Sequence, residues 1–339
     1  MQTEQQLIVT SSPHIHSGYT ISSAMRDVIL SLVPAVIAAV YFFGLTAALV
    51  MATCVLAAIA AEYICQRIMQ RDITIADGSA ALTGLLLAMC LPPVLPLWIA
   101  AIGSAFAIVI GKQVFGGLGC NVFNPAHIGR AILLASFPAQ MTTWSWPGGE
   151  VDAVTKATLA DAVSGATPLV QLKMATEKFA PEDVMQAVTG NTSIIDLFTG
   201  NIAGSLGETC VPALLLGGLY LIWRGHIDWR IPVYYLGSVF VIMLAYAMFN
   251  GYGLEFSLFH LLSGGLIIGA FFMATDWVTS PLTAKGRIIF AIGLGVLTCL
   301  IRLKSSYSEG VCYSILLMNM LTPLIDRYSK RRVFGRSAK

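Results

Sequence analysis

Charged residues are scarce in this sequence. Aspartate, glutamate, lysine and arginine make up 11% of the 339 positions, and hydrophobic residues make up 56%. Soluble globular proteins carry about 25% charged residues, so a water-soluble fold would lack the polar side chains to cover its surface. The scarcity of charge excludes an ordinary soluble protein and favours a chain that lies mostly in a lipid bilayer. The net charge of +2 gives no reason to expect a nucleic-acid partner.

Clustered cysteines are also missing. The seven cysteines stand singly, mostly within apolar stretches, and no C-x-x-C pair occurs. Iron–sulfur and zinc sites need several thiolates close together, so we predict that these cysteines are small buried side chains and that the chain holds no metal. A phosphate-binding loop and a dinucleotide fingerprint are absent as well. Residues 1–20 lack the basic region of a cleavable signal peptide.

Ten apolar stretches account for most of the chain. A membrane-spanning helix needs about 20 apolar residues, and several of these stretches are somewhat shorter. They lie at 28–44, 46–64, 79–95, 97–111, 126–138, 209–223, 231–249, 258–275, 288–301 and 311–325. We therefore expect an all-α membrane protein with about ten transmembrane helices and one sizeable polar loop.

The positions of lysine and arginine predict the orientation, because basic residues collect on the cytoplasmic side of membrane segments. The densest basic cluster is the tail 327–339, which places that end in the cytoplasm, and ten crossings bring residues 1–25 to the same side. Segment 140–207 then lies on the periplasmic face, between transmembrane halves 26–139 and 208–326. Its excess of acidic residues fits an exported loop. Arg302 and Lys304, near an outer helix end, are exceptions to the rule.

Two stretches of the sequence resemble each other. Residues 79–89 and 263–273 are both rich in small and apolar side chains, and each is followed by a proline-containing break and another apolar run. Two related halves of five helices would explain the similarity. Because five is odd, the halves would be inverted, an architecture in which a site lies at the repeat interface. Chance similarity between such helices is the alternative.

One threonine of the polar segment has the features of a modification site. Residues 161–168 read Asp-Ala-Val-Ser-Gly-Ala-Thr-Pro. Gly165 has no side chain and Ala166 has only a methyl group, so the hydroxyl of Thr167 is expected to be accessible, and Pro168 fixes the backbone after it. A plain turn is the alternative, since these are common loop residues.

Several stretches together resemble one family. Residues 161–167 resemble the acceptor motif of the flavin transferase that joins FMN through its phosphate to a threonine hydroxyl. Residues 77–88, 115–126 and 260–276 resemble the D subunit of the Rnf electron-transport complex and, more distantly, the B subunit of the sodium-pumping NADH:quinone reductase. The resemblance runs in order along nearly the whole chain. Trp277 departs from it, because proline is usual there in the family.

The resemblance implies a function within a larger complex of the bacterial inner membrane. The complex would couple NADH and ferredoxin oxidoreduction to movement of Na⁺ or H⁺, and this chain would relay electrons through FMN bound covalently to Thr167 without being catalytic alone. Asp161, Ser164, Gly165 and Ala166 would complete that flavin site. The implied partners are the other subunits, including iron–sulfur and second flavinylated subunits, and the flavin transferase that matures the chain.

A second candidate flavin site follows the fourth apolar stretch, on the expected cytoplasmic side. Gly116 and Gly117 allow backbone to approach a ligand closely, and Asn121 and Asn124 carry amides suited to the imide edge of a flavin. By resemblance, these residues and Lys112 would hold a non-covalent riboflavin or second FMN. A tight turn with satisfied asparagines is the alternative.

Acidic residues near the ends of apolar stretches are candidates for an ion path, because carboxylates are costly within a membrane. Glu62 and Asp276 lie nearest to the apolar runs. Others, such as Glu208 and Glu309, are equally explained by a place among lipid headgroups. Two alternative functions stay open, a solute channel or carrier of inverted-repeat type and a purely structural scaffold. A bound flavin would distinguish the redox subunit from both.

Overall fold

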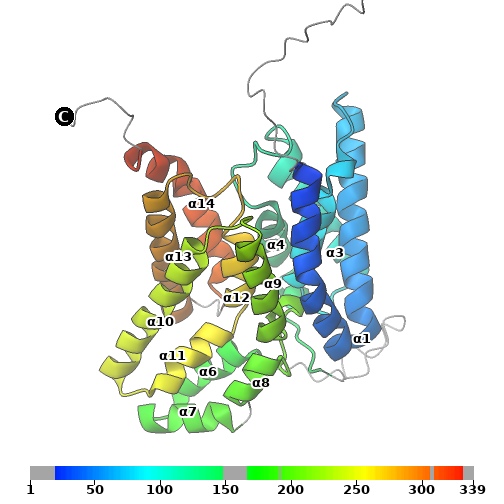
Figure 1. The fold of residues 1–339 in the computed structure, drawn as a ribbon. Coiled ribbons are helices and arrows are strands. Elements are labelled where there is room, and N and C mark those ends of the chain that lie inside the picture. Colours follow the sequence, from blue (N-terminus) through cyan, green and yellow to red (C-terminus); the bar gives the residue numbers. More distant parts are fainter. Residues whose placement is uncertain (1–19, 148–165, 191, 306–308, 331–339) are drawn as a thin grey trace, which may run out of the picture.

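The computed structural model describes residues 20–147, 166–190, 192–305 and 309–330. Within these ranges the chain is helical and contains no β-strand, which confirms the all-α fold class (Figure 1). Asp161, Ser164 and Gly165 of the predicted flavin site lie outside the described residues.

The first two apolar stretches form α1, Ile21–Ile68. Its two arms meet at Gly44, whose φ of 66° lies in the left-handed region that glycine adopts without steric cost. Figure 1 shows the chain reversing its direction there. The helix begins at Ile21, within the segment that the basic-residue pattern assigns to the cytoplasm.

The remaining helices before the polar segment are short. A 3-10 turn, η1, precedes α2, and Gly78 between them has a φ of 79°. α3 continues directly into a π-helical turn, η2, in which the backbone is wider than in an α-helix. The bounds are η1 Ile75–Asp77, α2 Ser79–Met89, α3 Leu97–Ile108, η2 Val109–Gln113, α4 Pro125–Ser136 and α5 Pro138–Met141.

The helices after the polar segment include one broken pair. α11 and the helix formed by α12 and η5 meet at a bend of 63°, where Gly264 and Gly265 have φ values of 70° and 64°. The bounds are α9 Val211–Trp223, α10 Arg230–Asn250, α11 Leu254–Leu262, α12 Leu266–Ile268, η5 Gly269–Met273, α13 Ala284–Lys304 and α14 Val311–Tyr328. The turn η5 is π-helical, like η2.

The two sets of helices pack in a corresponding order. α1 contacts α3 and α3 contacts α4, while α10 contacts α13 and α13 contacts α14. The sets meet where α4 contacts α14 and where α1 contacts α9. Ten membrane crossings and an inverted relation between the halves stay predictions.

The described part of segment 140–207 forms a helical cap. Its bounds are α6 Pro168–Lys178, α7 Pro181–Thr189, α8 Ile194–Thr199 and η4 Leu206–Glu208. In Figure 1 the helices α6, α7 and α8 lie at the end of the bundle opposite the end where α14 finishes. The cap and the end of α14 are therefore separated by the length of the bundle.

Length and composition identify the helices able to cross a membrane. Among the described residues α1, α10 and α13 qualify, and the bent pair of α11 and α12–η5 raises the count to four. α2 and α9 contain 11 and 13 residues, which is too few for a complete crossing at 1.5 Å per residue. α3 and η2 together form a longer apolar helix, Leu97–Gln113, which is still among the shorter ones. Large apolar side chains on the long helices are exposed, such as Ile37 and Phe249, as expected for a membrane-embedded protein.

Glycine allows α9 to pack closely against α1. A Cβ atom on Gly217 would lie 2.1 Å from the backbone carbonyl oxygen of Ser31, far inside van der Waals contact. Gly237 of α10 has open space around its Cβ position. The two glycines therefore form a matched pair for testing the packing between the two sets of helices.

We expect Gly217→Ala to destabilise the protein by about 1–3 kcal/mol, because backbone atoms must move to admit the methyl group. Gly237→Ala should leave stability unchanged or raise it slightly, since alanine favours helix. Thermal unfolding of the detergent-purified protein measures both effects. Equal melting temperatures for the two variants would contradict the close approach of α9 and α1.

Candidate functional site

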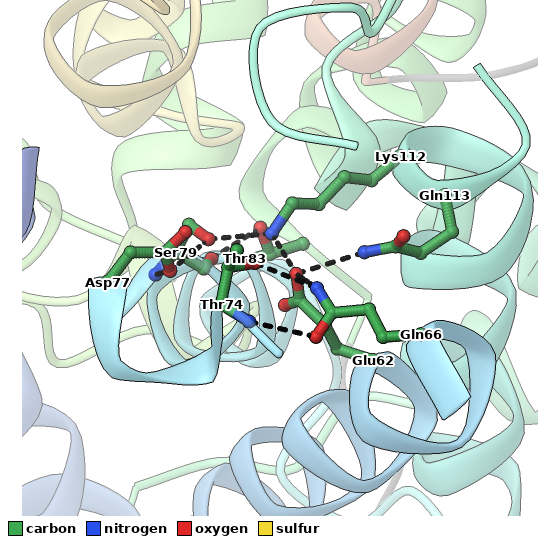
Figure 2. Close-up of polar contacts among 8 residues, drawn as sticks. All are labelled: Glu62, Gln66, Thr74, Asp77, Ser79, Thr83, Lys112 and Gln113. Carbon is green, nitrogen blue, oxygen red and sulfur yellow. Dashed lines mark hydrogen bonds and ion pairs between the residues drawn. The ribbon is translucent and has the colours of Figure 1, made fainter. Parts of the chain in front are cut away.

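A buried ion pair joins the second arm of α1 to the π-helical turn η2. Lys112 Nζ lies 2.7 Å from Glu62 Oε1, and the two side chains are 2% and 0% exposed. The same carboxylate oxygen accepts hydrogen bonds from Gln113 Nε2 at 2.9 Å and Gln66 Nε2 at 3.2 Å (Figure 2). Because charge-assisted hydrogen bonds are strong in a dry interior, this cluster fixes α1 against α3.

Hydrogen bonds connect the ion pair to the start of α2. Lys112 Nζ also donates to Ser79 Oγ at 2.6 Å, and Ser79 Oγ and its backbone N–H donate to Asp77 Oδ1. Gln66 closes the network on the other side, since it binds both the hydroxyl and the backbone N–H of Thr74 (Figure 2). One lysine thereby holds together three separate segments of the first half.

Two predicted site residues thus meet in one contact. Glu62, predicted for the ion path, and Lys112, predicted for the second flavin site, are partners in the ion pair. Glu62 Oε2 has no hydrogen-bond partner among the described residues. The ammonium group of Lys112 already binds Glu62 and Ser79. The main role of the ion pair is therefore to hold the helices together, and contact with a ligand is secondary.

A cavity of about 100 Å³ lies between the two sets of helices. Lys112, Asn121 and Asn124 contribute to its wall together with residues of η5 and the turn after it. A wider cavity of about 900 Å³ includes Gly116 and Gly117 in its lining. The two cavities share the lining residues Met25, Leu118, Asp276 and Trp277. The structure therefore brings the predicted second-site residues to two adjoining cavities.

The asparagines are partly engaged in the fold. Asn124 caps α4 by accepting from the backbone N–H of Ala126 at 3.0 Å, and its Nδ2 donates to the Met273 carbonyl at 3.2 Å. Asn121 Nδ2 donates to the Phe123 carbonyl at 3.1 Å and lies 3.4 Å from Asp276 Oδ2. The amide oxygen of Asn121 is the group best placed to meet a ligand, since Asn124 uses both of its amide atoms.

Asp276 lies in the turn after η5, at the junction of the two cavities. Burial raises the pKa of the Asp276 carboxyl, while hydrogen bonds from the Thr279 hydroxyl and from nearby amides oppose this shift. Trp277, the departure from the family pattern, donates its indole N–H to the His226 carbonyl at 2.6 Å. The tryptophan therefore ties this turn to the one after α9.

A second ionic cluster fixes the other wall of the inner cavity. Asp27 of α1 accepts from Arg224 Nη2 at 2.8 Å, and His226 Nε2 lies 2.6 Å from the same oxygen. These contacts join the start of α1 to the end of α9. They hold His226, a lining residue of the cavity, in place.

Thr167 caps the helix α6. Its Oγ1 accepts from the backbone N–H of Val170 at 3.4 Å, and Pro168 occupies the first helical position, where no N–H is needed. Gln171 donates to the carbonyl of Ala166 at 2.8 Å, which steadies the residue before the cap. The predicted acceptor threonine therefore lies at the start of a helix of the cap.

The expectation of an accessible hydroxyl at Thr167 is wrong for this structure. The side chain is 2% exposed, because the hydroxyl turns inward to cap α6 instead of projecting from a turn. Small neighbours in the sequence do not ensure exposure when the residue itself is needed as a cap.

A group of charged side chains near the helical cap includes Glu208 and Glu309, for which the sequence left open an ion path or a place among lipid headgroups. Arg130 of α4 forms an ion pair with Glu309, and Arg302 of α13 is 4% exposed. Glu208 of η4 is also 4% exposed. The sequence signal for these positions was present: Arg302 breaks the basic-residue pattern, and Gly264 and Gly265 mark a helix break beside it.

These features define a class of protein. The chain is an all-α membrane protein whose helices enclose ionisable side chains and adjoining cavities, and two of its helices are joined through a glycine break of the kind found at transport sites. The family described as NQR2, RnfD, RnfE matches residues 8–335, and the chain belongs to it.

Relatives of similar length agree with this assignment. The chain is 48% identical to the D subunit of the proton-translocating ferredoxin:NAD(+) oxidoreductase complex of Clostridium ljungdahlii, over 96% of each chain. It is 46% identical to the D subunit of the Na(+)-translocating ferredoxin:NAD(+) oxidoreductase complex of Acetobacterium woodii, over 98% of this chain and 96% of that one. It is 42% identical to the D subunit of the ion-translocating oxidoreductase complex of Stutzerimonas stutzeri, over 94% of each.

The buried ion pair yields a prediction. We expect Lys112→Met to destabilise the protein by about 3–5 kcal/mol, because it leaves the Glu62 charge buried without its cation. The double variant Glu62→Gln with Lys112→Met should regain much of that loss, since neither charge remains. Thermal unfolding of the purified protein measures the difference. A double variant less stable than Lys112→Met would contradict the role given to the pair.

Proposed function

We propose that this chain is the D subunit of an ion-translocating ferredoxin:NAD⁺ oxidoreductase complex and that it relays electrons through FMN esterified to Thr167. The observation that carries the first part is the near-complete alignment with the D subunits of such complexes at 42–48% identity. The flavin rests on the resemblance of residues 161–167 to an acceptor motif, together with the position of Thr167 in the fold.

The start of α6 suits a phosphoester. The first turn of a helix carries backbone N–H groups without intrahelical partners and the positive end of the helix dipole, both of which stabilise an anion. The Oγ1 of Thr167 already lies within reach of the Val170 N–H, so a phosphate on this oxygen would take over the cap. The buried hydroxyl imposes one condition, that attachment occurs while the start of α6 is open.

The flavin would supply the electron chemistry when bound, and the protein would supply position and environment. A covalent link suits a relay, because the group is retained through every turnover. α6 is anchored for such a role, since Lys173 Nζ donates to the Ser305 carbonyl at 2.6 Å and Gln171 lies 3.3 Å from Thr192 Oγ1. The helix is thereby attached to α13 and to the loop before α8.

The adjoining cavities support a second, non-covalent flavin, riboflavin or FMN. The wider cavity, about 900 Å³, is within the range of roughly 300–1,000 Å³ usual for small-molecule sites. Gly116 and Gly117 have φ values of 126° and 100°, so they present bare backbone to it. The free amide oxygen of Asn121 would accept from the imide N–H of a flavin, and the indole of Trp277 offers a surface for stacking.

The orientation follows from the same proposal. The start of α1 and the end of α14 would lie on the cytoplasmic side of the inner membrane, and the cap with Thr167 on the periplasmic side. The separation of the cap from the end of α14 supports this arrangement (Figure 1). Two inverted halves of five apolar stretches are supported by the corresponding helix contacts and by the two π-helical turns, although α2 and α9 are too short for complete crossings.

The proposed ion path includes Asp276 and, less directly, Glu62. Asp276 lies at the junction of the two cavities and is half-buried, whereas Glu62 is held by Lys112. The partners would be the other subunits of the complex, with iron–sulfur and second flavinylated subunits among them, and a flavin transferase during maturation.

The covalent flavin is tested by substitution of its acceptor. We expect Thr167→Ala to abolish flavin fluorescence of the denatured chain in a gel, whereas Thr176→Ala, a control on the same helix, should retain it. Mass spectrometry of the peptide around Thr167 should show the added mass of FMN in the wild-type chain. An unmodified peptide in protein from the native host would defeat the proposal.

Two substitutions separate the roles of the inner cavities. Asn121→Leu should lower the amount of flavin extractable by denaturation without affecting the covalent flavin, because it removes the amide acceptor. Asp276→Asn should retain both flavins but reduce ion transport by the complex in vesicles, because it removes a titratable carboxylate. Unchanged extractable flavin in the first variant, or unchanged transport in the second, would remove that residue from its assigned role.

A further inference from the structure

Four charged side chains lie together near the helical cap, away from the cavities described above, and two of them are buried and two partly buried. They are Arg130 of α4, Glu208 of η4, Arg302 of α13 and Glu309 before α14. Electrostatic interaction links Glu208 to each of the other three. The cluster draws on helices from both halves of the chain, so a change in its charge acts on their interface.

The two arginines are neutralised in different ways. Arg130 has Glu309 as its ion-pair partner. Arg302 donates to the carbonyls of His260, Ser263 and Gly264, at the broken end of α11. Among the described residues no ion pair is found for Arg302. Its charge is met by carbonyl dipoles and by the negative end of the helix, with Glu208 as the carboxylate nearby.

Two members of the cluster, Glu208 and Arg302, each have a buried atom without a hydrogen-bond partner among the described residues, and for Arg302 this atom is Nε. Glu208 Oε1 accepts from Ser205 Oγ at 2.9 Å, while the buried Oε2 of Glu208 is its unpartnered atom. Oε2 faces Gly204, where an added Cβ would lie 2.6 Å away. A buried carboxylate oxygen without a donor is costly when ionised, and a proton on that oxygen removes the buried charge.

We propose that Glu208 is a proton-binding group of the complex, which takes up and releases a proton at Oε2 as ions are moved. The proposal rests on the ion-translocating function proposed above. A proton fits better than Na⁺, because Na⁺ would need several oxygen ligands and would face Arg130 and Arg302. Deprotonation leaves the carboxylate to balance Arg302, and protonation leaves the cluster with one net positive charge.

The cluster is connected to the helix that begins at Thr167. A small cavity of about 60 Å³ is lined by Leu169 and Lys173 of α6 and by His260 and Arg302. The Leu169 side chain also lies against Gly264, where an added Cβ would be 2.3 Å from its Cδ1. A change of charge at α6 would therefore alter the electrostatic environment of Arg302. Through Arg302 it would alter the affinity of Glu208 for its proton.

The test is labelling of the intact complex with dicyclohexylcarbodiimide, which reacts with protonated carboxyls in apolar surroundings. Peptide mass spectrometry should locate the label on Glu208, with labelling that declines as pH rises and is unaffected by Na⁺ at constant pH. Glu208→Gln should lose this label and reduce proton transport in vesicles. Glu255→Gln, which alters an exposed acid of α11, should change neither.

A second variant keeps the test decisive if Glu208→Gln does not assemble. Gly204→Ala retains the carboxyl but pushes against Oε2 and should alter the pH at which labelling is half-complete. Absence of label on Glu208 in a complex whose Thr167 carries flavin would overturn the proton site and leave the flavin proposal intact. Labelling that falls with Na⁺ at constant pH would overturn the choice of the proton.

Discussion

Charge that is buried away from water must find a partner within the protein, and this constraint organises the whole structure. An unpaired ion in a low-dielectric interior costs several kcal/mol, on the order of the total stability of a domain. Lys112 with Glu62, Asp27 with Arg224, and Arg130 with Glu309 meet the constraint by pairing. Each pair joins segments far apart in the sequence, so charge neutralisation also fixes how the helices are arranged.

Arg302 meets the same constraint through backbone carbonyls, and no ion pair is found for it in the part of the chain that the structure describes. The break between α11 and α12 leaves backbone carbonyls without helical donors, and the guanidinium group supplies those donors. Irregular backbone at membrane depth is tolerated only when it is satisfied in this way. The arginine therefore acts as a tethered cation at a site whose geometry, in other membrane proteins, accepts a mobile one.

The helices were predictable from the sequence because each is marked by a run of apolar residues within its own segment. Each of the ten apolar stretches coincides at least in part with a helix, and the reversal between the first two is marked by Gly44. The short helices were harder to interpret. α2 is apolar because most of its side chains are enclosed by other helices, whereas α9 also has exposed apolar side chains such as Leu216. Composition alone does not distinguish either helix from a complete crossing.

The sites were predictable only in part, because partners distant in sequence decide their roles. Asn121 and Gly116 are predicted for a flavin site and Asp276 for an ion path, and all three line adjoining cavities. The contact between Glu62 and Lys112 spans 50 positions and has no local signature. Glu208 and Glu309 were equally well explained by lipid headgroups, and only the packing of α4, α13 and η4 shows that Glu208 is buried and Glu309 partly buried. The flavin on Thr167 stays a prediction, and its capping role has no signature in the sequence beyond Pro168 after it.

The π-helical turn η2 has a consequence for the register of the chain. Lys112 and Gln113 are adjacent in sequence, yet both donate to the same oxygen of Glu62. The wider turn holds one residue more than an α-helical turn and leaves the following residues rotated relative to the preceding ones. Deleting Ile110 or Gly111 would restore ordinary winding and turn the lysine away from its carboxylate. The length of this segment is therefore as tightly constrained as its chemistry.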